Sequence, residues 1–334
     1  MPVSRFLVVS VTIGIFGLGL ATVVGLLGWW STFADAFSHF RMHLAVASLA
    51  VAGIAAAAGL QVTWRHVVAA LAIALVNLGF ALKFDRAPLV AAAGGSTLKV
   101  MTVNVLYRAS NDDQIVAEIA AEQADVVLFQ ELTKARQSLL GRLAVTHPWQ
   151  ISCADSSTTR PWRCDVAIVS RHPWEAAAAA AVGTTATKLA WARFGADRGH
   201  LLVASVHLQW PLISDQAAQL RAVRDRLATH AGPMVVAGDL NAAPWSAAVR
   251  GFTRQSRLRS AGGFTPTWPR RTFVHGHACA VCIPQMQIDH VFVSSQVRVL
   301  DVRTGRDVSS DHLPLIAQLE VPRAVATNRS AAAN

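Results

Sequence analysis

Hydrophobic and polar positions follow two different patterns along this chain, and the change falls near residue 90. Before it, three uncharged apolar runs cover residues 6–30, Leu44–Leu60 and Val67–Leu82. The first exceeds the roughly 20 residues that a helix needs to cross a bilayer, and its two terminal tryptophans suit the membrane interface. We therefore expect a bundle of about three transmembrane helices over residues 1–90. Two spans or one span are the alternatives, because the second and third runs are near the lower length limit for a membrane span.

A cleaved signal peptide is the alternative for the first run. Its apolar stretch is longer than the ~7–15 residues of such peptides, and further apolar segments follow, so anchoring is favoured. The positive-inside rule does not decide the orientation, because Arg5, Arg41, Arg65 and Lys83 are spread over both sides of the predicted spans. An odd number of spans with the N-terminus inside would place the remainder outside the membrane.

After residue 90, short strand-like runs alternate with amphipathic helical stretches. This pattern predicts one α/β domain over residues 98–321, preceded by a linker at 91–97 and followed by a disordered tail at 322–334. Two helices are expected at 112–123 and 214–230. Strands are expected at 98–105, 125–129, 166–170, 188–194, 201–208, 234–237, 288–293 and 315–319.

Acidic and amide side chains stand where several of these strands end. They are Asn104, Glu131, Asp239, Asn241, Asp289 and Asp311. Strand ends of an α/β domain can hold polar groups rigidly around one pocket. Carboxylate and amide oxygens are the ligands that Mg²⁺ prefers, with Mn²⁺ as the alternative. Mg²⁺ in turn suits a phosphate-containing substrate.

The residues of these motifs and their order along the chain strongly resemble the motifs of the endonuclease/exonuclease/phosphatase superfamily. This superfamily includes pancreatic-type deoxyribonuclease, abasic-site endonucleases, sphingomyelinases and inositol-polyphosphate 5-phosphatases. The resemblance runs from Leu98 to Glu320 and implies a four-layer α/β fold, with two facing sheets flanked by helices, and Mg²⁺-dependent phosphohydrolysis. The motifs that carry it are Val-Asn104-Val, Gln130-Glu131, Gly238-Asp239-Leu240-Asn241-Ala, Asp289-His290 and Asp311-His312.

By this resemblance, Glu131 and Asp311 would hold the metal, and Asn104 would help to place the metal or the phosphate. Asp239 would orient or deprotonate the attacking water, and Asn241 would donate to a phosphoryl oxygen as charge develops. Each residue also has an ordinary alternative: an acid at a strand end can cap the next helix, and an Asp-x-Asn sequence is often a turn.

The histidines form the second part of the implied site. Asp289 would orient His312, which contacts the scissile phosphate, and His207 would be a second active-site histidine, as proton donor or phosphate ligand. The acidic partner of His207 is not identified by the resemblance, and Asp165 is a candidate. His290 would point to the opposite face of its strand and is expected to be structural.

Four cysteines lie in the predicted catalytic domain. Cys153 and Cys164 bracket a polar loop and suit a disulfide in an oxidising compartment, whereas four reduced thiols are the alternative. The segment from His275 to Cys282 also offers four zinc-type donors. A bridge between Cys279 and Cys282 or a rim loop is favoured there over a metal.

The predicted membrane anchor indicates the substrate class more directly than the net charge of the chain does. After Ser96 the chain has 25 Lys and Arg against 18 acids, and this surplus of seven suits polyanionic substrates or anionic lipid headgroups. The Arg- and Ala-rich composition of a GC-rich genome is the favoured explanation of that surplus, and no basic run interleaved with aromatics supports nucleic-acid binding. A multi-pass enzyme gains effective concentration on membrane lipids, so a lipid phosphate or prenyl pyrophosphate is the expected substrate. The expected location is a bacterial cytoplasmic membrane with the catalytic domain outside. An extracytoplasmic nuclease is the runner-up, and a non-catalytic membrane scaffold is the third hypothesis.

Overall fold

The computed structural model describes residues 2–58, 64–107, 111–153, 164–274, 277–280 and 285–322. Two six-stranded sheets face each other in an α/β sandwich, as the resemblance implied. The first has the order β13 (Arg298–Thr304), β14 (Leu315–Val321), β1 (Ser96–Asn104), β2 (Val126–Gln130), β4 (Ala167–Ser170) and β3 (Trp149–Ser152). The second has the order β5 (Trp174–Val182), β6 (Thr187–Phe194), β7 (Leu202–His207), β8 (Met234–Asp239), β12 (Asp289–Val293) and β9 (Arg259–Ser260).

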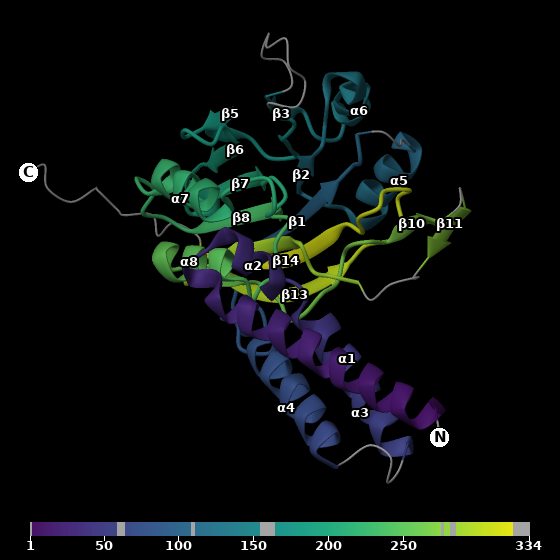
Figure 1. Cartoon of the computed structure of the whole chain (residues 1–334). Helices are drawn as coiled ribbons and strands as arrows, with labels where there is room; N and C mark the ends of the chain where they lie inside the picture. Colours follow the sequence, from purple (N-terminus) through teal and green to yellow (C-terminus); the bar gives the residue numbers. More distant parts are fainter. Residues whose placement is uncertain are drawn as a thin grey trace, which may run out of the picture. The chain divides into compact units, whose positions relative to one another are not determined.

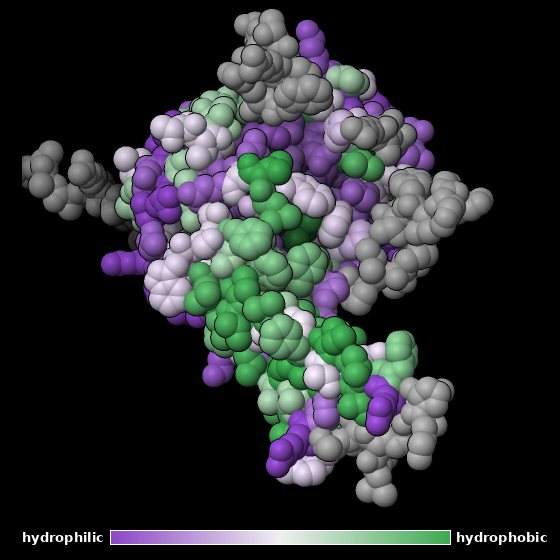
Figure 2. Space-filling model, in the orientation of Figure 1, coloured by the Kyte–Doolittle hydropathy of each residue, from purple (hydrophilic) through white to green (hydrophobic). Residues whose placement is uncertain are grey.

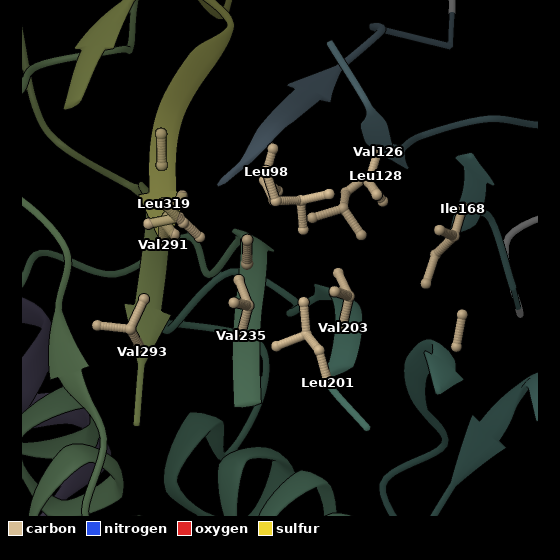
Figure 3. Packing of buried hydrophobic residues seen from close by; sticks show 14 of the residues in the cluster. Leu98, Val126, Leu128, Ile168, Leu201, Val203, Val235, Val291, Val293 and Leu319 are labelled. Atoms are coloured by element: carbon tan, nitrogen blue, oxygen red, sulfur yellow. The ribbon is translucent and has the colours of Figure 1, made fainter. Parts of the chain in front are cut away.

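The main core lies between these sheets. Alternate residues of each strand point inward, so Leu98, Leu128 and Ile168 of the first sheet face Val203 and Val235 of the second (Figure 3). All five side chains are fully buried. Because burying one such side chain contributes roughly 1.5–3 kcal/mol, this face fixes the register of the strands that carry the site.

A parallel pair of strands lies at the centre of each sheet, and this topology brings the site residues together. β1 pairs with β2 and β7 with β8, while the other pairings are antiparallel. The register sets Asn104 beside Gln130 and His207 beside Asp239 at the carboxyl ends of these strands. β12 runs antiparallel to β8 and sets Asp289 opposite Asp239.

Helices cover the outer faces. α5 (Asp112–Glu122) buries Ile115 and Ile119 against the first sheet, together with α6 (Ser138–Leu143). A short 3-10 turn, η3 (Lys134–Arg136), precedes α6, and η4 (Ala196–Arg198) joins β6 to β7. On the second sheet, Arg226 of α7 (Gln216–Leu227) lies over the Trp191 ring of β6. Outside both sheets, β10 (Arg271–Val274) and β11 (His277–Ala280) form a hairpin.

The N-terminal helices α1 (Pro2–Leu26), α3 (Arg41–Ala57) and α4 (Trp64–Ala81) run side by side, and they are predominantly hydrophobic (Figures 1 and 2). Between α1 and α3 lie the 3-10 turn η1 (Leu27–Trp29) and the short helix α2 (Thr32–Ser38), which the sequence did not predict. Two described stretches, Arg5–Trp29 and Trp64–Ala81, are long and apolar enough to cross a membrane. The expected third span exists only if α2 and α3, which are bent by 54°, count as one.

The chain's contacts divide it into two compact units whose limits differ from the predicted domains. The first unit joins residues 1–85 to 209–221 and 241–255, and the second holds the remainder. The predicted linker is tied to the second unit, because Glu320 accepts hydrogen bonds from Ala93 N and Gly95 N. Ser96 and Thr97, assigned to the linker from the sequence, are the first residues of β1.

The structure contains the disulfide that the sequence suggested, between Cys153 and Cys164. The proposals for the segment from His275 to Cys282 fall outside the described residues, since both of its end residues do. The predicted disordered tail also lies outside them, apart from Pro322.

Candidate active site

Local backbone constraints fix the strand ends that carry the site. Gly238 has a φ of 144°, and a Cβ there would lie 1.9 Å from the Val206 carbonyl oxygen, so only glycine fits beside β7. Glu131 and Asn241 both adopt the left-handed region, with φ of 58° and 47°. Non-glycine residues are held there at a cost, and such strain clusters at functional sites.

Asn104 links two of the carboxylates. Its side chain is fully buried, and Nδ2 donates to Glu131 Oε1 at 3.0 Å and to Asp239 Oδ2 at 2.9 Å. Its Oδ1 accepts from Leu106 N at 2.9 Å. Tyr107 N donates to the other oxygen of Glu131 at 3.0 Å. Asn104 therefore positions the two acids in this arrangement, and its role as a direct metal ligand stays a prediction.

The expected pair of Asp289 and His312 is present. His312 Nδ1 lies 2.8 Å from Asp289 Oδ2, which also accepts from Thr267 Oγ1 at 2.5 Å. His312 Nε2 lies 3.8 Å from Asp239 Oδ2. With Nδ1 donating to the aspartate, the Nε2 edge of the ring is directed at Asp239, where a substrate oxygen would be contacted.

A second Asp–His pair approaches Asp239 as well. His207 Nδ1 lies 2.9 Å from Asp165 Oδ1, and His207 Nε2 lies 3.8 Å from Asp239 Oδ2. Asp165, only a candidate from the sequence, is thus the acidic partner of His207. Lys188, which the sequence did not single out, donates to the other oxygen of Asp165 at 2.5 Å. Asp239 therefore stands between two oriented imidazoles.

The electrostatics of these pairs favour charged histidines. Burial opposes the charge of His312, but the carboxylates of Asp289 and Asp239 outweigh it and raise its pKa to about 10. Burial likewise opposes the charge of His207, yet Asp165 raises the pKa of that ring. Burial would raise the pKa of Asp165, whereas His207 and Lys188 lower it to about 2. Both histidines thus have a raised pKa, and each faces the carboxylate that raises it.

The acids fit a hard divalent cation. Two groups of three donors lie within 4.8 Å of one another, namely Glu131, His207 and Asp239, and Asp239, Asp289 and His312. Asp311 is in neither group. Its Oδ2 accepts from Trp268 Nε1 at 3.2 Å, and its buried Oδ1 has no hydrogen-bond partner among the described residues. Asp311 therefore has one carboxylate oxygen that the described residues do not satisfy, and its role as a metal ligand stays a prediction.

The sequence of this chain matches a family model directly. The model of the endonuclease/exonuclease/phosphatase family covers residues 101–312, which span the site from β1 to His312. The chain belongs to the endonuclease/exonuclease/phosphatase family. Members of this family are typically hydrolases of phosphoester bonds and depend on divalent metal ions, in agreement with the donor groups described above. No curated protein matches the chain significantly in sequence.

Solved structures share the fold. A family member from Bacteroides vulgatus has a TM-score of 0.55 and 18% identity, covering 68% of this chain and 99% of that one. A member from Beutenbergia cavernae has a TM-score of 0.51 and 22% identity, covering 68% and 72%. D. rerio TDP2, in complex with a single-strand DNA product, has a TM-score of 0.50 and 16% identity, covering 68% and 100%.

The remaining predicted residues fall as follows. His290 is buried and stacks on Phe292 with ring centroids 5.1 Å apart, which agrees with a structural role. Asn241 follows β8 by two residues, and its carbonyl accepts from Gln216 Nε2 at 3.0 Å.

Thr267 and Lys188 were missed, because a threonine in a loop and a lysine at a strand start carry no sequence signal for a partner far along the chain.

Proposed function

We propose that this protein is a membrane-anchored, divalent-metal-dependent phosphohydrolase that cleaves a phosphoester or pyrophosphate bond of a lipid-linked substrate. The observation that carries the hydrolytic part is the convergence of two Asp–His pairs on Asp239, beside the Glu131 carboxylate.

Each residue has a role in this proposal. Glu131 and Asp311 would hold Mg²⁺, with Mn²⁺ as a substitute, and the bound cation would neutralise phosphate charge. Asp239 orients the attacking water and accepts its proton. His207 and His312, oriented by Asp165 and Asp289, bind the phosphoryl oxygens.

Asn241 would donate to the same group of oxygens as negative charge develops on them. Asn104 holds Glu131 and Asp239 at their separation through its two hydrogen bonds.

Two features support a lipid-linked substrate. The first is the pair of helices long and apolar enough to span a membrane. The second is the turn after His207, where Trp210, Leu212 and Ile213 are 56%, 67% and 76% exposed. Ile213 N donates to Trp210 O at 3.2 Å, so the turn is ordered, and it belongs to the same compact unit as the N-terminal helices. Exposed apolar groups of this kind suit contact with lipid.

A substrate panel tests the proposal. The purified full chain, supplied with Mg²⁺, is incubated with polyprenyl pyrophosphate, phospholipid vesicles and plasmid DNA. Release of phosphate or headgroup from a lipid substrate is the expected result. Cleavage of DNA alone would favour the nuclease hypothesis. The fold shared with TDP2 and the net charge of +10 are the reasons for keeping this alternative. No turnover with any phosphate ester would favour the scaffold.

The exposed turn offers a sharper version of the panel. Replacing Trp210, Leu212 and Ile213 by serine should lower hydrolysis of the lipid substrate while leaving a soluble phosphodiester unaffected. Val145→Ser is the matched control, because Val145 is an exposed apolar residue, 92% accessible, outside this turn. Equal losses on both substrates would contradict the lipid-contact role.

A further inference from the structure

The N-terminal helices hold the chain segment that directly follows the Gly238–Asn241 motif. Helix α8 (Ala247–Ser256) begins six residues after Asn241. Asp35 of α2, only 5% exposed, accepts hydrogen bonds from Ala247 N at 2.7 Å and from Ala248 N at 2.9 Å. The first amides of a helix have no partner within it, and a carboxylate there also complements the helix dipole. A residue 212 positions earlier therefore caps α8.

The segment between Asn241 and α8 is buried against the same helices. Trp245 Nε1 donates to the Ser38 carbonyl at 2.8 Å, and Ala243 and Trp245 pack in one cluster with Met42 and Ala81. Ser38 Oγ donates to Asp35 Oδ1 at 2.6 Å, which orients the capping carboxylate. The cap and the packing are thus one connected contact.

Close packing of η1 completes this contact. A Cβ at Gly28 would lie 2.8 Å from Asp35 Oδ1 and 3.0 Å from Asp35 Cα, so a larger residue would displace α2. The neighbouring Trp29 ring lies 5.5 Å from Arg250 and 5.4 Å from Arg254, both on α8. Gly28 is required where it stands, whereas at Gly17 of α1 an added Cβ would meet no atom within 4 Å.

We propose that Asp35 is a positioning residue for catalysis, which acts by fixing α8 and the segment 241–246 and so holds Asn241 in place. The Gln216 hydrogen bond to the Asn241 carbonyl holds the other end of this segment. The inference rests on the role proposed for Asn241. It gives α2 a role in positioning Asn241, in addition to the anchoring role proposed for the N-terminal helices.

The test uses the full chain in detergent with a soluble phosphodiester and Mg²⁺. Asp35→Ala and Gly28→Ala should lower kcat by about 10-fold or more with little change in KM, because a donor that acts on developing charge is misplaced. Asp35→Asn, whose amide oxygen still accepts, should fall between the parent and Asp35→Ala. Gly17→Ala is the matched control for Gly28→Ala, because it makes the same substitution in the neighbouring helix α1 where an added Cβ meets no atom within 4 Å, and it should keep the parental kcat.

Hydrogen exchange gives a readout that is independent of turnover. The amides of Ala247 and Ala248 should exchange faster in Asp35→Ala and Gly28→Ala than in the parent and in Gly17→Ala. A folded Asp35→Ala chain with parental kcat and parental exchange would overturn the positioning role. If the parent itself hydrolyses nothing, the proposed function fails, and unchanged exchange at these amides would separately overturn the cap.

Discussion

The carboxylate of Asp239 lies at the centre of the candidate site. Asn104, His207 and His312 approach it from three strands or loops that are far apart in sequence. The motifs indicated these residues: Asn104 and His207 each end an apolar strand, and His312 follows Asp311 in the motif before the last strand. The partners of His207 were harder to predict. Asp165 was only one candidate acid, and Lys188 has no local pattern that indicates its contact with Asp165.

The two Asp–His pairs predict a specific loss of activity. Asp289→Asn and Asp165→Asn preserve shape but remove the charge that orients and protonates His312 and His207. We expect each to lower kcat at least ~100-fold, as loss of an orienting aspartate does elsewhere. Steady-state kinetics of the folded variants, verified by thermal melting, measure this.

Asp301→Asn is the control for these variants, since Asp301 is an exposed carboxylate on β13. Parental turnover in Asp289→Asn would show that the pair is only structural.

At the scale of elements, eight strands were predicted closely, whereas β13 and the alanine-rich β5 were not predicted. The sequence predicted β1, β2, β4, β6, β7, β8, β12 and β14 to within two residues at each end. β5 reads Trp-Glu followed by six alanines and a valine, which local propensity assigns to a helix rather than a strand. Its pairing with β6 along the sheet edge overrides that preference, and such pairing is not visible in a local window.

The contact between the segment before β1 and strand β14 has a predicted pH dependence. Burial opposes the charge of Glu320, but hydrogen bonds from Ala93 and Gly95 and the charge of Arg298 lower its pKa from 4.5. The folded-state pKa is depressed, so the stabilisation is present above pH 4.5 and is lost as the pH falls through the folded-state pKa. Glu320→Gln should therefore lose less stability than the parent between neutral pH and pH values below 4.5.

Thermal melting of both chains across this range measures the difference. Asp301→Asn serves again as the control, because Asp301 is exposed and its carboxylate pairs with Arg303 of the same strand. Identical pH profiles for the parent and Glu320→Gln would contradict the contact.

For the molecule as a whole, the change of hydrophobic pattern near residue 90 lies close to residue 85, where the first segment of the N-terminal compact unit ends. It could not show that residues 241–255 belong with the helices, because the contact between Asp35 and α8 depends on two positions without sequence signal. The number of spans also stayed open, since the bend between α2 and α3 depends on tertiary packing.

We propose that the sandwich lies outside the cytoplasmic membrane, where the Cys153–Cys164 disulfide would persist. Alkylation of the denatured protein should label Cys153 and Cys164 only after reduction, and protease added to spheroplasts should digest the sandwich. Labelling of both without reductant, together with full protection from the protease, would place the sandwich in the cytoplasm.

The central claim is metal-dependent phosphoester hydrolysis at Asp239, and one comparison tests it most directly. The full chain is freed of metal with chelator, and hydrolysis of bis(p-nitrophenyl) phosphate is followed as Mg²⁺ is added back, in the parent and in Asp239→Ala. We expect turnover that appears only with Mg²⁺ in the parent and is at least ~100-fold lower in the variant, with the same expectation for Glu131→Ala and His312→Ala. Near-parental hydrolysis by a folded Asp239→Ala chain, or turnover that ignores the metal, would contradict the account.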